Sequence, residues 1–169
     1  SPGLRVRHAR ALRRLLARHG PELALNVTQD FGRKADEVLA TDVLPTADAC
    51  QFLERNAWRV LKPTHLSGNS RPMWLFSSRE TIHRRPHGVV GIIGTWNYPI
   101  SLNTVQILQA LVPGNAVLWK PSEVVPATSR GNKALFDEAG FPRDLLVILP
   151  PTPEAGAPLA EAADDPPAS

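Results

Sequence analysis

Residues 88–123 read GVVGIIGTWNYPISLNTVQILQALVPGNAVLWKPSE, and this stretch decides the fold class. It opens with the apolar run 88–94, which is typical of a strand buried on both faces. Residues 99–111 then carry apolar side chains at helical spacing, and the following Pro-Gly-Asn stops that helix. Residues 116–119 form a second apolar run. The stretch therefore predicts a strand, a helix and another strand.

The same alternation continues toward the C-terminus. Residues 127–139 predict a second helix, and 145–149 predict a third strand. A β-α-β-α-β order implies an α/β fold with a parallel, incomplete Rossmann-like sheet. Ligands of such sheets bind beyond the carboxyl ends of the strands, which here are residues 94–99 and 120–123. The Pro-rich end of the chain predicts an irregular tail.

The residues before the sheet read differently. Residues 1–61 predict helices, with Pro21 expected to end one helix and begin the next. Between residues 62 and 87, Gly, Asn and Pro interrupt the pattern, and residues 74–76 and 81–82 predict short strands. The predicted organisation is a helical segment over 1–61, extended strands over 62–87, a partial Rossmann-like domain over 88–150 and an irregular tail over 151–169.

Composition restricts the class of protein. The chain has 169 residues, 43% hydrophobic and 21% charged, which suits a globular domain and excludes a wholly disordered chain. The single cysteine, Cys50, excludes a disulfide framework, and we expect it to be a half-buried helical residue. No apolar run approaches the roughly 18 residues that span a bilayer. A cytoplasmic location is therefore expected.

Charge is distributed unevenly along the chain. Residues 1–85 carry 15 Lys or Arg against 8 acids, whereas residues 86–169 carry 4 against 8. Six arginines precede the first acid, Glu22, and such a cluster suits nucleic acid, an anionic membrane or a targeting peptide. No aromatic residue interleaves with these arginines, which favours a solvated helix face. Neither nucleic acid nor membrane is the expected partner.

Two loops carry the candidate chemistry. Gly94 permits close approach of backbone to a ligand. Asn97 offers an amide at a strand end, where it could donate to an oxyanion or could simply cap the following helix. Lys120 and Glu123, three residues apart, could bracket a ribose or could form a surface ion pair of little energetic value. The common phosphate-binding motifs G-x-G-x-x-G and Walker A are absent from the sequence.

Taken together, the segments 88–99 and 111–123 closely resemble the NAD(P)-dependent aldehyde dehydrogenase superfamily. The resemblance implies oxidation of an aldehyde to a carboxylic acid through a thioester on an active-site cysteine, with hydride passing to the nicotinamide. It implies that the side-chain amide of Asn97 donates to the substrate oxyanion, making Asn97 catalytic. It also implies a cofactor site formed by Ile93, Gly94, Thr95, Trp96, Asn97, Lys120, Ser122 and Glu123.

Within that site, Lys120 and Glu123 would hold the adenosine ribose. The Glu123 carboxylate would repel a 2′-phosphate, so the resemblance favours NAD, although members with this glutamate accept NADP as well. The family's oligomerisation strands correspond to residues 62–87, which implies a homo-oligomer at full length. The substrate would be a small-molecule aldehyde, and no metal site is predicted.

The family's nucleophilic cysteine and general-base glutamate have no counterpart in residues 1–169, and Cys50 precedes the cofactor domain. The chain therefore resembles only the N-terminal, cofactor-binding part of a family member. One interpretation is part of an active aldehyde dehydrogenase. The alternative is a truncated cofactor-binding fragment with no activity of its own. In both, the isolated chain is expected to be inactive.

Overall fold

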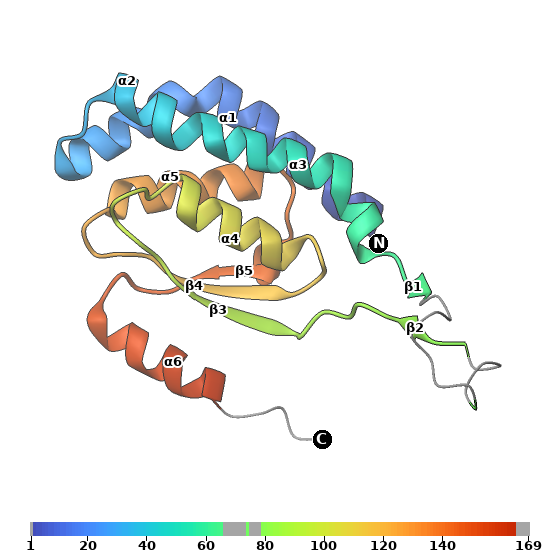
Figure 1. Ribbon diagram of the computed structural model, residues 1–169. Helices are drawn as coiled ribbons and strands as arrows, with labels where there is room; N and C mark the ends of the chain where they lie inside the picture. The colour runs from blue at the N-terminus through green and yellow to red at the C-terminus, as the bar shows by residue number, and fades with distance from the viewer. Residues whose placement is uncertain (1, 66–73, 75–78, 165–169) are drawn as a thin grey trace.

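The computed structural model describes residues 2–65, 74 and 79–164. Its first element, helix α1 (Pro2–Phe31), lies beside helix α3 (Leu44–Leu61) in an outer helical layer (Figure 1). One stripe of α1 is buried against its neighbours. The stripe consists of Ala9, Leu12, Leu16, Gly20, Leu23, Ala24 and Val27.

The predicted helix boundary at Pro21 is wrong, because α1 runs through Pro21 without ending. A proline inside a helix costs about 3 kcal/mol or more, through the lost N–H and the clash with the preceding turn. Buried residues lie on both sides of Pro21, so tertiary packing of the whole stripe offsets this cost. Helix α1 ends instead at Phe31, and the following Gly32 has a φ of +83°, which suits glycine.

Helix α2 (Ala35–Val38) continues through a π-helical turn (Leu39–Val43) into α3. Proline at position 45 is accommodated in the first turn of α3. Cys50 lies in α3 and is fully buried, whereas the sequence predicted only half burial. The helical character of residues 1–61 is otherwise as predicted.

Short antiparallel strands follow the helices. Strand β1 (Thr64–His65) pairs with β2 (Thr81–Ile82), which confirms the second predicted strand of this region. Of the other predicted strand, residues 75–76 lie outside the described residues, and Trp74 is exposed and not in a strand.

The central sheet has the predicted topology. Strands β3 (Val89–Ile93), β4 (Ala116–Lys120) and β5 (Leu146–Ile148) lie in the order β3-β4-β5, and both pairs are parallel. Helices α4 (Ser101–Leu111) and α5 (Pro126–Glu138) connect them and lie between the sheet and the outer helices (Figure 1). The helical spacing predicted for residues 99–111 places five side chains on the inward side, and all of them are buried. They are Ile100, Thr104, Ile107, Leu108 and Leu111.

The two faces of this sheet are covered differently. Ile92, Val117 and Trp119 are buried beneath α4 and α5. On the other face Val89 is 63% and Ile93 54% exposed, so the prediction that this strand is buried on both faces is wrong. The alternation of side chains along a strand separates these two sets.

The predicted irregular tail is also partly wrong. A short 3-10 turn (Pro153–Ala155) leads into helix α6 (Gly156–Asp164), which lies on the open face of the sheet (Figure 1). Helix α6 contacts β3. A Cβ atom added at Gly91 would lie 2.9 Å from a methyl group of Leu159. The lack of a side chain at Gly91 thus lets α6 approach the strand closely.

Two carboxylates of the N-terminal segment cap the first turns of both connecting helices. Asp42 accepts hydrogen bonds from the backbone N–H groups of Ile100 and Ser101 at the start of α4. Asp30 accepts from the N–H of Ala127 (3.1 Å) and from the N–H and hydroxyl of Thr128 (2.8 and 2.7 Å) at the start of α5. These contacts satisfy N–H groups that have no partner inside the helices.

Candidate functional site

The carboxyl ends of β3 and β4 bring the two predicted loops together. Ile93 is paired with Lys120 in the parallel register. The N–H of Gly94 then donates to the carbonyl oxygen of Lys120 at 2.7 Å. The structure thus places three of the predicted site residues side by side at the edge where ligands of parallel sheets bind.

Gly94 is surrounded by protein side chains. A Cβ atom at this position would lie 2.8 Å from Asn103 Oδ1 and 2.8 Å from Trp119 Nε1. Real Cβ atoms do not approach other atoms this closely, so any other residue would force the loop or α4 to move. The need for glycine here comes from internal packing.

Asn103 of α4, which the sequence analysis missed, holds the loop of residues 94–99 by hydrogen bonds. Its Oδ1 accepts the Thr95 N–H at 3.0 Å, while its Nδ2 donates to the carbonyl oxygens of Pro99 (2.8 Å) and Thr95 (3.2 Å). Asn132 on α5 also donates to the Pro99 carbonyl, at 3.1 Å. The sequence did contain a sign of this role, because Asn103 is a polar residue among the buried positions of α4. A buried amide requires hydrogen-bond partners.

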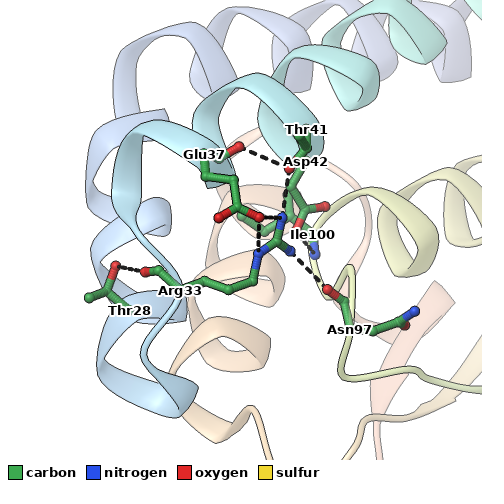
Figure 2. Close-up of polar contacts among 7 residues, drawn as sticks. All are labelled: Thr28, Arg33, Glu37, Thr41, Asp42, Asn97 and Ile100. Carbon is green, nitrogen blue, oxygen red and sulfur yellow. Dashed lines mark hydrogen bonds and ion pairs between the residues drawn. The ribbon is translucent and has the colours of Figure 1, made fainter.

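Trp96 and Asn97 lie at the exposed tip of this loop. The Trp96 ring meets Phe31 edge-on, with centroids 5.9 Å apart. The side-chain amide of Asn97 has no hydrogen-bond partner among the described residues, and its backbone carbonyl oxygen accepts from Arg33 at 2.8 Å. Figure 2 shows this carbonyl facing the Arg33 guanidinium while the amide extends away from it.

The contacts of Asp42 test the capping interpretation of Asn97. It is fully buried and accepts the Ile100 and Ser101 N–H groups, so α4 already has its cap. Burial raises the pKa of Asp42, and these N–H groups together with Arg33 oppose that rise. Asn97 makes no capping bond. The capping interpretation is therefore wrong, and the amide is available to a ligand.

Asp42 was also missed by the sequence analysis. It shares a four-residue spacing with Val38, Thr46 and Cys50, all of which are buried. A carboxylate in such a stripe signals a buried polar contact, because an unpaired buried charge is costly. The partner, 58 residues away in sequence, could not be read from that spacing.

Lys120 and Glu123 form the predicted pair. Lys120 Nζ lies 3.3 Å from Glu123 Oε2, and the two side chains are 8% and 55% exposed. Glu123's own backbone N–H and then Lys120 hold the pKa of the Glu123 carboxyl below its usual range. The Ser122 hydroxyl accepts the Val124 N–H at 3.2 Å and shapes the turn. The buried lysine distinguishes this pair from an ordinary surface ion pair.

A hollow of about 330 Å³ lies beyond the ends of β4 and β5. Pro121, which follows Lys120 directly, lines it together with residues of α5 and of the segment after β5. The segment that carries the charged pair therefore also contributes Pro121 to a mainly apolar hollow. This combination suits a nucleoside, with its polar sugar and its flat apolar base.

Cys50 lies away from these loops, in α3. Burial raises the pKa of its thiol to about 12. A thiol with such a pKa is almost entirely protonated near neutral pH, and the thiolate is the nucleophilic form. The structure therefore gives Cys50 a packing role.

The N-terminal arginines are partly used inside the protein. Arg5 donates to the carbonyl oxygens of Val112 (2.7 Å) and Pro113 (3.0 Å). Arg10 and Arg13 both bind Glu54, at 3.1 and 2.6 Å. Ion pairing with Glu54 in turn raises the pKa of Arg13. The cluster is thus less available to nucleic acid than its sequence suggests.

The described part of the chain contains no helix long and apolar enough to cross a bilayer. Within that same part, no group of three or more His, Cys, Asp or Glu side chains gathers where it could hold a metal ion.

Parallel strands joined by crossover helices define a Rossmann-like class of α/β protein. The aldehyde dehydrogenase family model matches residues 1–165. A protein of Caulobacter vibrioides, named as a probable coniferyl aldehyde dehydrogenase, is 33% identical over 143 residues, which cover 84% of this chain and 29% of that protein. This chain belongs to the aldehyde dehydrogenase family.

Solved structures agree with this assignment. An indole-3-acetaldehyde dehydrogenase without ligand superposes with a TM-score of 0.81 and 30% identity, over 95% of this chain and 35% of that one. A Sinorhizobium meliloti protein assigned as a methylmalonate-semialdehyde dehydrogenase and complexed with NAD gives a TM-score of 0.80 at 23% identity, over 94% and 31%. The second likeness shows the fold alone. The chain spans about a third or less of these relatives' length.

Proposed function

We propose that this chain is the N-terminal, cofactor-binding part of an NAD(P)-dependent aldehyde dehydrogenase that converts an aldehyde to a carboxylic acid. Asn97 would donate its side-chain amide to the oxygen of the reacting aldehyde, where negative charge develops. The nicotinamide, when bound, would accept a hydride. Family membership supports the reaction class, and the exposed amide supports the role of Asn97.

The observation that carries this proposal is the separation of two tasks at the start of α4. Asp42 supplies the helix cap, and the Asn97 amide has no hydrogen-bond partner among the described residues. A donor that is held ready by its backbone and not used by the protein costs little to employ in a transition state. An amide engaged in capping would have to give up that bond first.

Lys120 and Glu123 are proposed to bind the adenosine ribose of the cofactor. Lysine donates hydrogen bonds and carboxylate accepts them, so the pair matches both functions of a sugar hydroxyl. Lys120 donates to one described side chain, which leaves further donor capacity for a ligand. An ionised Glu123 repels a 2′-phosphate, so we propose NAD as the preferred cofactor, with NADP as the weaker one.

The remaining cofactor contacts are proposed along the loop after β3. Ile93, Gly94, Thr95 and Trp96 would line one side of the cofactor, opposite Ser122 and the charged pair. Gly94 and Thr95 are fixed by Asn103 and Lys120, so the loop is rigid enough to orient a ligand.

The buried thiol supports a second proposal, that residues 1–169 have no dehydrogenase activity by themselves. Cys50 is the single cysteine of the sequence and cannot provide the thiolate. We further propose that the full-length protein is a cytoplasmic homo-oligomer with residues 62–87 at its interface, and that the segments 1–61, 62–87 and 88–150 act as its helical, oligomerisation and cofactor units.

Replacing Asn97 by alanine in the full-length protein tests the main proposal. We expect kcat with NAD and an aldehyde to fall by about 10²–10³, as on loss of an oxyanion donor. The affinity for NAD should fall much less than kcat, because Asn97 is one of eight residues in the expected cofactor site. Asn56→Ala is the matched control, since Asn56 is a helical residue of α3 that bonds within its own helix. A wild-type kcat in Asn97→Ala would refute the role of Asn97.

A further inference from the structure

Arg33 connects the N-terminal helices to the loop that carries Asn97. It follows the end of α1, and its side chain reaches across to Asn97 (Figure 2). One Nη atom donates to the Asn97 carbonyl oxygen at 2.8 Å. The guanidinium carbon lies 4.8 Å from the centroid of the Tyr98 ring, within the range of cation–π attraction. A single side chain thus binds two consecutive residues of the loop.

The guanidinium is itself fixed from the side of α2. Its Nε and one Nη lie 3.2 and 3.1 Å from Glu37 Oε1. That Nη also donates to the Thr41 hydroxyl at 2.6 Å, and this hydroxyl donates to the Glu37 carbonyl oxygen at 2.9 Å. The carbonyl oxygen of Arg33 accepts from the Thr28 hydroxyl at 2.6 Å. Only 14% of the Arg33 side chain is exposed.

These contacts matter because the Asn97 amide has no hydrogen-bond partner of its own among the described residues. An exposed side chain on a loop normally samples several orientations. The conformational entropy lost when it is fixed reduces the favourable free energy of its contact with a ligand. Two anchors hold the loop from the sheet side, namely Asn103 and Lys120. Asn97 lies beyond both of them, and Arg33 binds its backbone directly.

We propose that Arg33 is a positioning residue, which holds the backbone of Asn97 so that its amide faces the reacting oxygen. This inference rests on the proposed function of Asn97. Arg33 touches neither substrate nor cofactor in this account. The planar guanidinium suits the task, because it binds Asn97, Glu37 and Thr41 at once and stacks on Tyr98.

The test compares Arg33→Met, Arg33→Lys and the control Arg143→Met in the full-length protein. Arg143 is 86% exposed and lies just before β5, whereas the loop follows the carboxyl end of the parallel strand β3. We expect Arg33→Met to lower kcat by about 10- to 100-fold, as when a catalytic group is displaced by an ångström, with KM for NAD changed less than about twofold. Arg33→Lys should recover part of kcat, since an ammonium can donate to the Asn97 carbonyl but cannot bind Glu37 and Thr41 at the same time.

A double-mutant cycle separates positioning from a general structural effect. If Arg33 acts through Asn97, then Arg33→Met should lower kcat less than about twofold in the Asn97→Ala background. Equal losses in both backgrounds would overturn the inference, and so would a wild-type kcat in folded Arg33→Met. A wild-type kcat in Asn97→Ala would overturn the proposed function itself, and this inference with it.

A measurement without catalysis completes the test. Hydrogen exchange, followed by mass spectrometry on the peptide 94–101, should be faster in Arg33→Met and unchanged in Arg143→Met. Unchanged exchange in Arg33→Met would contradict the inference. Should Arg33→Met fail to fold, Glu37→Gln weakens the hold on the guanidinium from behind and should show the same effects at smaller size.

Discussion

The two faces of the three-stranded sheet are built from similar apolar residues, yet they differ in what covers them. Val117, Trp119 and Leu146 lie beneath α4 and α5 and are nearly inaccessible. Val89, Ile93 and Val147 point to the opposite face and remain partly exposed, although α6 contacts β3 there. Side-chain chemistry therefore does not decide burial in this sheet. Burial depends on whether a second layer is present on each face.

The comparison also separates the residues that stabilise the fold from those proposed to bind the cofactor. The packed face holds α4 in place, and α4 in turn holds the loop through Asn103. Lys120 lies on the other face by strand alternation, and its stem approaches Gly156 at the start of α6. Mutations on the packed face should thus destabilise the protein, while mutations of the exposed side chains on the open face should change its stability little.

Trp119→Ala should have the largest effect. Trp119 is completely buried, and removing its ring leaves a cavity that the surrounding structure can fill only partly. We expect the free energy of unfolding to fall by about 3–5 kcal/mol, measured by urea unfolding followed by circular dichroism. Trp119→Phe, which retains an aromatic ring, should lose clearly less. A loss below 1 kcal/mol in Trp119→Ala would contradict the assigned packing.

Asp42→Ala should have an intermediate effect. The Ile100 and Ser101 N–H groups would lose their acceptor at the buried start of α4, which costs about 1–3 kcal/mol of unfolding free energy. Thermal unfolding measures the loss. Asp48→Ala, at an exposed position of α3, is the control and should be neutral. Equal stability of the two variants would show that α4 does not depend on this cap.

Val147→Thr should have the smallest effect. Val147 is 39% exposed on the open face of β5, and threonine keeps the β-branched shape. We expect the free energy of unfolding to change by less than about 0.5 kcal/mol. The same substitution at Val117, which is buried on the packed face, should cost measurably more. Similar losses at both positions would remove the distinction between the faces.

Regular features of the sheet region could be predicted from the sequence. The β-α-β-α-β order follows from short apolar runs alternating with helical stripes, and each boundary carries Gly or Pro. The inward side of α4 follows from its spacing in the same way. The local sequence pattern was sufficient to predict the element order and the inward side of α4, because both depend on residues that are close together in the chain.

Features that depend on distant residues could not be predicted. The continuity of α1 through Pro21 depends on packing against α3 and α5, and the burial of β3 depends on which layers meet it. The sequence analysis left two roles open for Asn97. The position of Asp42 excludes the capping role, and donation to an oxyanion is the role that we propose. Arg33, 64 residues before Asn97, carries no local signal of its contact with that loop.

The two helix caps also bear on synthesis. Asp30 and Asp42 leave the ribosome before the helices that they cap, because translation proceeds from the N-terminus. Each acceptor is therefore already available when the first turn of α5 or α4 emerges, and helix initiation is the unfavourable step of helix formation. The order of residues along the chain thus lets the first-made helices act as a template for the later ones.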